Sequence, residues 1–195
     1  MKKLFEQYGA FNALGAGVLG FLYAVSFVIL KDATLSALFL MLSGLLALPV
    51  MVALYSRLKE VDENFALIAL ILGVVGAFGY LMHGGYDLAN VINPPKLVNI
   101  DLPSQVDPRG LLAFGVTGLA ILKFSWLAQK SKSFPGGFST LGFLSGLLLL
   151  VIYLARLIVL SPTSPTLLYP VLLEGFVVNP VWYLWLGSIL WGKRS

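Results

Sequence analysis

Cysteine is absent from this chain of 195 residues, and histidine occurs once, as His83. Without cysteine, the chain has no disulfide bond, thiolate-bound metal, cysteine nucleophile or iron–sulfur cluster held by cysteine. A single imidazole also disfavours bis-histidine haem and the two-histidine zinc motifs within one chain. Charged residues make up only 11% of the chain, whereas soluble domains hold about 25%. These shortages disfavour bis-histidine haem, iron–sulfur clusters and cysteine-ligated metals within the chain, and they leave the identity of any cofactor open.

Long apolar segments dominate instead, because 58% of the residues are apolar. A membrane-spanning helix needs about 20 mostly apolar residues. Six segments qualify: 8–30, 34–56, 65–91, 109–128, 138–160 and 167–191. We therefore predict a single all-α domain, a bundle of six transmembrane helices in the plasma (inner) membrane, with the lipid bilayer as its partner.

The basic residues predict how the helices are threaded. One side of the membrane would carry nine of them, Lys2, Lys3, Arg57, Lys59, Lys123, Lys130, Lys132, Lys193 and Arg194, and the other side Lys31, Lys96 and Arg109. The positive-inside rule then places both termini in the cytoplasm (N-in/C-in) and the loop 92–108 outside. We interpret the "SRLKEVDEN" and "QKSKS" segments as solvated topology signals. The net charge of +4 thus reflects topology, and no nucleic-acid partner is expected.

Small residues recur at helical spacing in two of the predicted spans. Gly9, Ala13 and Gly17 follow one face of the first span, and glycines 73, 76 and 79 lie on the third. Such rows let helix backbones approach closely in lipid. They predict packing seams inside the bundle, with an oligomer interface as the alternative.

Polar residues interrupt the third span near its outer end. Tyr80, His83, Asp87 and Asn90 are three, four and three residues apart, a spacing that puts them on one face of a helix. Arg156 in the fifth span and Glu174 in the sixth fall in the same outer third. Ionisable groups at such depths usually pair with each other or line a wet cavity.

We therefore predict a polar network between the third, fifth and sixth spans, in which Arg156 bridges Asp87 or Glu174. Tyr80, His83, Tyr86, Asn90 and Tyr153 would complete its hydrogen bonds. Alternatively, Arg156 extends outward to the interface. His83 either binds its i+4 neighbour or serves as a pigment or haem ligand or a proton relay. The network is either structural or a site for a ligand, an ion or a proton.

The segment "LYSRLKEVDENFALIALILGVVGAFG" (54–79) resembles uncharacterised bacterial multi-pass membrane proteins, in which a short basic loop, an asparagine and an alanine- and leucine-rich helix follow the second span. The resemblance covers about a seventh of the chain. It implies the same type of fold and no activity.

Three hypotheses for function follow. The first is a non-enzymatic accessory or assembly subunit of a larger membrane complex, because the chain is small and shows no catalytic constellation. The alternative is a small-molecule or ion-binding protein or carrier, with a polar pocket in the outer half of the bundle. An enzyme comes third, with Asp87 or Glu174 as acid or base and His83 as its partner. Phosphate-binding and dinucleotide motifs are absent from the sequence.

Overall fold

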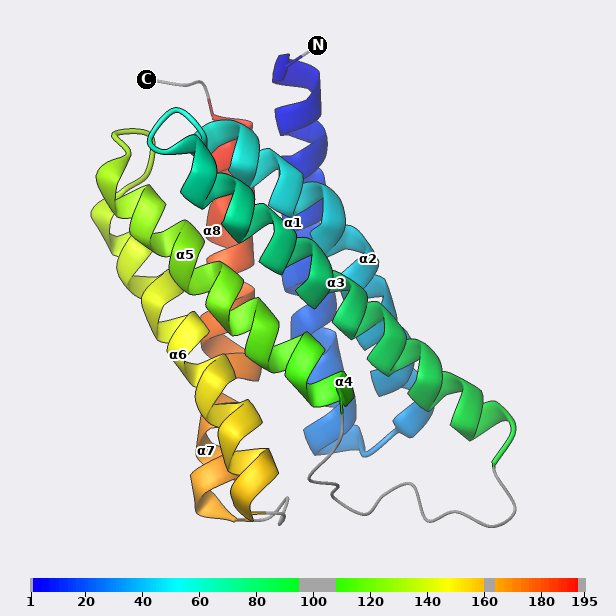
Figure 1. The fold of residues 1–195 in the computed structure, drawn as a ribbon. Helices are drawn as coiled ribbons and strands as arrows, with labels where there is room; N and C mark the ends of the chain where they lie inside the picture. Colours follow the sequence, from blue (N-terminus) through cyan, green and yellow to red (C-terminus); the bar gives the residue numbers. More distant parts are fainter. Residues whose placement is uncertain (1, 95–107, 160–163, 193–195) are drawn as a thin grey trace.

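The computed structural model describes residues 2–94, 108–159 and 164–192, which form helices joined by short turns (Figure 1). Six helical spans are long and apolar enough to cross a membrane: Leu4–Leu30, Ala33–Leu58, Glu63–Ile92, Leu111–Lys130, Gly136–Val159 and Pro165–Trp191. The elements are α1 (Lys2–Ala24), η1 (Val25–Leu30), α2 (Ala33–Leu58), α3 (Glu63–Ile92), α4 (Pro108–Gly110), η2 (Leu111–Val116), α5 (Thr117–Lys130), α6 (Gly136–Val159), α7 (Pro165–Leu173), η3 (Glu174–Val178) and α8 (Asn179–Trp191). The predicted all-α bundle of six spans is confirmed.

Aspartate caps fix two of the turns between spans. The Asp32 side chain accepts a hydrogen bond from the backbone N–H of Leu35 at 2.9 Å, and Asp62 accepts one from Phe65 at 3.1 Å. These contacts satisfy amide groups that have no partner in the first turn of a helix. Lys31 adopts the left-handed conformation, with φ of 52°, and ends the preceding helix. Each turn therefore reverses the chain within a few residues.

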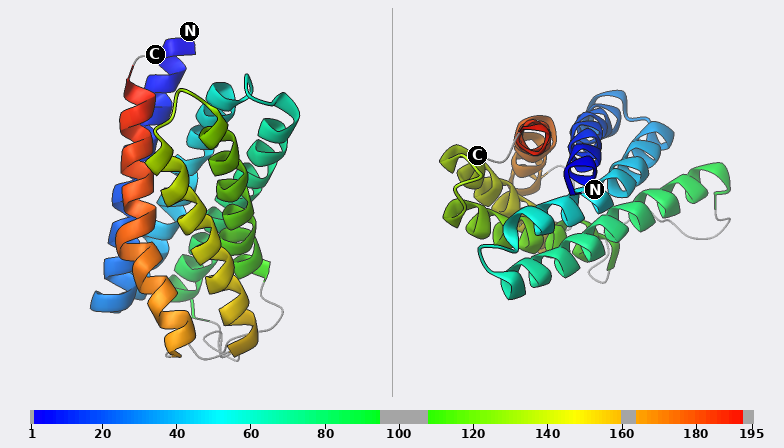
Figure 2. Two further views of the ribbon diagram at one scale, coloured as in Figure 1. Left: turned by 90° about the vertical axis from the view of Figure 1, so that its left-hand side faces the viewer. Right: turned by 90° about the horizontal axis from the view of Figure 1, so that it is seen from above.

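The spans form a closed ring in which each one packs against its neighbours in sequence. The contacts run from α1 to α2, α3, α5 and α6, and then to α7 and α8; α8 returns to α1 and closes the ring. The view along the bundle shows this order (Figure 2). Both termini lie at one end, with the turns after α2 and α5; the turn before α2 lies at the other end, here called the outer end.

A dense core fills the half of the ring nearest the termini. Trp182 is fully buried and stacks on Phe138, with ring centroids 5.5 Å apart. Leu54, Phe124 and Leu186 pack in the same cluster and are also almost completely buried. Trp182 therefore belongs to the core, whereas Trp191 is 58% exposed.

The predicted small-residue seams bring backbones together. A Cβ atom added at Gly9 would lie 2.6 Å from the Cβ of Ala53, and one at Gly79 would lie 2.6 Å from the backbone nitrogen of Ala113. Gly17 lies against Tyr183 in the same way, at 3.1 Å. Larger residues would force these helices apart, so the seams lie between helices of one chain.

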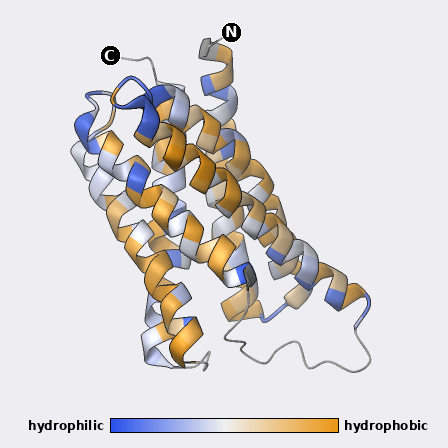
Figure 3. Cartoon of the chain, in the orientation of Figure 1, coloured by the Kyte–Doolittle hydropathy of each residue, from blue (hydrophilic) through white to orange (hydrophobic). Residues whose placement is uncertain are grey.

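The outside of the ring is apolar over its middle, and polar residues gather mainly at its ends (Figure 3). Large apolar side chains face outward on several spans, among them Phe11, Phe27, Ile71, Met82 and Ile158. In water, so large an apolar surface would be unfavourable. The protein is accordingly an integral membrane protein whose outer surface contacts lipid.

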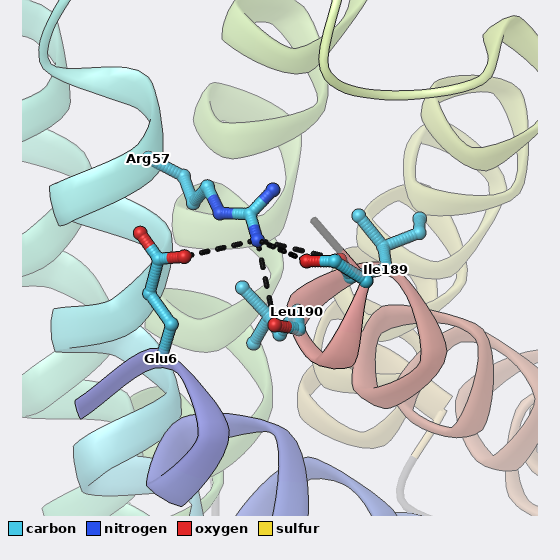
Figure 4. A network of polar contacts seen from close by, with 5 residues as sticks. Glu6, Arg57, Ile189 and Leu190 are labelled. Carbon is cyan, nitrogen blue, oxygen red and sulfur yellow. Dashed lines mark hydrogen bonds and ion pairs between the residues drawn. The ribbon is translucent and has the colours of Figure 1, made fainter. Parts of the chain in front are cut away.

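A buried ion pair lies near the termini, where solvated charges were expected. Arg57 Nη2 is 3.0 Å from Glu6 Oε2, and their side chains are only 2% and 9% exposed. The same nitrogen donates to the backbone carbonyls of Ile189, Leu190 and Gly192 at 3.3–3.5 Å (Figure 4). These carbonyls end α8, where the helix dipole favours a cation. The interpretation of Arg57 as a solvated topology signal is wrong.

Candidate functional site: a cavity in the outer half

A cavity of about 870 Å³ occupies the outer half of the ring, beyond the dense core. Residues from every span line it, along with the start of α4. Its charged and titratable lining residues are Tyr23, Lys31, Asp32, Tyr80, His83, Asp87, Arg109, Tyr153, Arg156, Glu174 and Tyr183. We call this space the outer cavity.

The polar stripe of α3 faces the outer cavity. Tyr80, His83, Asp87 and Asn90 all line it. His83 Nε2 lies 3.3 Å from Asp87 Oδ2, which is the i+4 pairing considered for this histidine. The stripe faces the interior because α3 presents its large apolar residues to lipid on the opposite face, for example Met82, which is 63% exposed.

Asp87 forms its ion pair with Arg109, which the sequence interpretation counted only as a topology signal. Arg109 Nη1 lies 2.8 Å from Asp87 Oδ1, and its guanidinium also covers the ring of Tyr86 at 4.6 Å. Tyr86 itself is 48% exposed and does not belong to the lining of the outer cavity. The stripe of α3 is therefore tied to α4.

The predicted bridge from Arg156 to Asp87 or Glu174 is absent from the ion pairs of the described residues, and this part of the prediction is wrong. In the ring, η2 and α5 separate α3 from α6, so the pairing falls to Arg109, on the neighbouring segment. Arg156 lines the outer cavity and is partly buried. Among the residues that the structure describes, no carboxylate forms an ion pair with Arg156.

Glu174 lies at the inner end of the outer cavity and is only 4% exposed. Ser145 of α6 donates a hydrogen bond to Glu174 Oε1 at 2.6 Å. The second oxygen, Oε2, has no hydrogen-bond partner among the described residues. Because Arg156 lies eleven residues beyond Ser145, it starts about 16 Å nearer the outer end of α6.

A π-helical segment carries this carboxylate. Glu174 begins η3, and Pro180 follows it near the start of α8. Proline cannot donate the backbone hydrogen bond that continues an α-helix, and wider turns are one way to accommodate it. The irregular turn ahead of Pro180 takes the form of a π-helix, and both Glu174 and Asn179 lie on the cavity lining.

The outer cavity therefore contains Tyr80, His83, Asp87, Asn90, Tyr153, Arg156 and Glu174 from the predicted set, while Tyr86 lies outside it. Residues that the sequence interpretation missed include Tyr23 and Tyr183. No charge or periodicity marked these tyrosines, since single phenols are common in membrane-spanning helices. Chemically, the cavity offers a paired carboxylate near its mouth, an unneutralised guanidinium and a buried carboxyl group at its inner end.

No protein-family model matches the chain, and no curated protein or solved structure shows significant similarity to it.

Proposed function

We propose that this integral membrane protein binds a small molecule in the outer cavity, as a binding protein or carrier. The observation that carries the proposal is the position of Arg156 and Glu174, two ionisable side chains on the cavity lining that form no ion pair with any other residue in the described part of the chain. Ionisable residues at membrane depth are costly, and they are commonly found where a ligand, an ion or water contacts them.

The volume and position of the cavity support this proposal. Small-molecule sites typically enclose about 300–1,000 Å³, and the outer cavity measures about 870 Å³. The inner half of the same ring is closely packed by apolar side chains. The outer cavity therefore lies toward the end that the positive-inside rule assigns to the outside of a plasma (inner) membrane.

The first hypothesis from the sequence, an accessory or assembly subunit, rests on the small size of the chain and the absence of catalytic motifs. It needs no cavity. The family resemblance of residues 54–79 also stays a prediction and carries no activity. The outer cavity thus favours the binding protein.

Cysteine labelling tests whether the cavity is open to water, because the chain has no cysteine of its own. Ser43 lines the cavity, whereas Leu45, two residues along α2, faces lipid and is 49% exposed. A charged, water-soluble methanethiosulfonate should modify Ser43→Cys in proteoliposomes and leave Leu45→Cys almost unmodified. Equal, slow labelling of both would contradict an open cavity.

Native mass spectrometry from a mild detergent tests whether the cavity holds a ligand. We expect a monomer that retains a small molecule, and we expect Ser43→Trp to lose it by filling the cavity. Leu45→Trp is the matched control, because its added ring enters lipid. A protein that carries other subunits and no small molecule would instead support the accessory role.

A further inference from the structure

We propose that the inner end of the outer cavity holds the positive group of an organic cation, with Glu174 as the counter-charge, and that binding releases one proton. This inference rests on the proposed function and names the class of its ligand. The carboxyl group of Glu174 is buried, lines the cavity and has one oxygen, Oε2, without a hydrogen-bond partner among the described residues. An incoming cation thus meets an available acceptor.

The surroundings of Glu174 explain why its carboxyl group holds a proton when the site is empty. The group interacts with the side chains of Ser145 and Asn179, which are both neutral, and no ion pair reaches it among the described residues. A bare carboxylate without a counter-charge is strongly disfavoured at this depth. The empty site therefore keeps the proton on Glu174, and a bound cation replaces it, so that the net charge of the site stays the same.

Other titratable groups line the outer cavity around Glu174 and toward its outer end. They are Tyr23 from α1, Lys31 and Asp32 from the turn before α2, Tyr80, His83 and Asp87 from α3, Arg109 from α4, Tyr153 and Arg156 from α6, and Tyr183 from α8. None lines the cavity from α7 among the described residues. Asp87 already pairs with Arg109 and His83, which leaves Glu174 as the carboxyl group at the inner end.

Three tyrosines add a second feature that suits a cation. The side chains of Tyr23, Tyr80 and Tyr183 line the same cavity as Glu174, and both Tyr80 and Tyr183 interact electrostatically with it. Aromatic faces attract ammonium groups, and several such faces together are typical of quaternary ammonium sites. The available volume also accommodates a cation of drug size.

Tetrapropylammonium is a suitable probe, because it carries a permanent charge and no proton of its own. Isothermal titration of the purified protein in two buffers with different ionisation enthalpies should reveal release of about one proton for each cation bound. In the range where Glu174 is protonated, affinity should rise about tenfold per pH unit. Binding without proton release, and without dependence on pH, would overturn the proposal.

Glu174→Gln keeps the shape of the side chain and an acceptor for Ser145 but cannot ionise. We expect it to abolish proton release and to weaken tetrapropylammonium binding by at least about tenfold. Glu174→Asp should retain proton release with altered affinity. Asp87→Asn, which changes a second carboxylate of the lining, is the matched control and should also retain proton release. Thermal unfolding of each variant checks that it folds.

A permanent anion, propanesulfonate, separates failure of this inference from failure of the proposed function. If Ser43→Cys is labelled but propanesulfonate binds and tetrapropylammonium does not, the cavity takes anions through Arg156, and the inference is wrong. If neither ion binds and Ser43→Cys is not labelled, the proposed function itself fails. Equal loss of binding and proton release in Asp87→Asn and Glu174→Gln would likewise refute a specific role for Glu174.

Discussion

Replacing Arg57 with methionine should destabilise the bundle strongly. The Arg57 side chain is 2% exposed, and it joins Glu6 near the N-terminus to the last carbonyls of α8. Methionine fills a similar volume but removes the cation that contacts Glu6 and the carbonyls at the end of α8. The loss therefore affects α1, α2 and α8 together.

The expected magnitude follows from what each substitution leaves behind. Removing one partner of a buried ion pair costs about 3–5 kcal/mol, because the remaining charge stays buried. We expect the loss of unfolding free energy caused by Arg57→Met to fall in this range. Glu6→Gln should cost less, about 1–2 kcal/mol, because Arg57 keeps its three carbonyl acceptors at the end of α8. The double variant should recover part of the loss caused by Arg57→Met.

Reversible unfolding in mixed micelles with increasing denaturing detergent measures these free energies. Lys59→Met is the matched control: Lys59 is the residue that caps α2 and lies over the ring of Tyr55 at 5.9 Å. Its replacement should change stability by about 0.5 kcal/mol or less. If Arg57→Met is no more destabilising than Lys59→Met, the ion pair does not hold these helices together.

Three further predictions concern the outer half and the threading. In a double-mutant cycle, Asp87→Asn and Arg109→Leu should show coupling of about 1 kcal/mol by thermal unfolding, because the pair is partly exposed; strictly additive losses would contradict it. Gly84→Ala should cost about 1–3 kcal/mol, since its new Cβ would lie 2.5 Å from the backbone of α2, whereas Gly136→Ala meets open space and should be nearly neutral. A reporter inserted at Leu102 should be extracytoplasmic and a C-terminal fusion cytoplasmic; the same side for both would refute the topology.

The fold could be predicted from the sequence because its signals are local and strong. Each span is a long apolar segment, and each turn contains charged, proline or glycine residues. Close packing at Gly9, Gly17 and Gly79 could also be predicted, since only small residues allow such approach between helices. The ends of the spans differ from the predictions by a few residues, as in the first span, which begins at Leu4 instead of residue 8.

The residues that line the outer cavity were easier to predict than the ion pairs that they form. Helical periodicity placed His83 and Asp87 on one face of a helix. Because exposing that polar face to lipid is costly, the face could be predicted to point into the bundle. Which cation reaches Asp87 depends on the order of helices around the ring, and no local pattern contains that order. Arg109 is the neighbour in space, whereas Arg156 lies beyond α5. Burial of Arg57 was missed because charge counting treats all basic residues near a span alike.

The pair of Arg57 and Glu6 differs from the pair of Arg156 and Glu174 in a way that bears on their roles. At the end with the termini, Arg57 is enclosed, and one of its nitrogens contacts a carboxylate and three carbonyls. Such an arrangement ties the ends of three helices together. In the outer half, Arg156 and Glu174 lie on the wall of a cavity and are separated along the bundle. A group that served only to join helices would gain stability by pairing these charges, as Arg57 and Glu6 do. Because they are kept apart around an open space, their arrangement suits a ligand that supplies the missing charges.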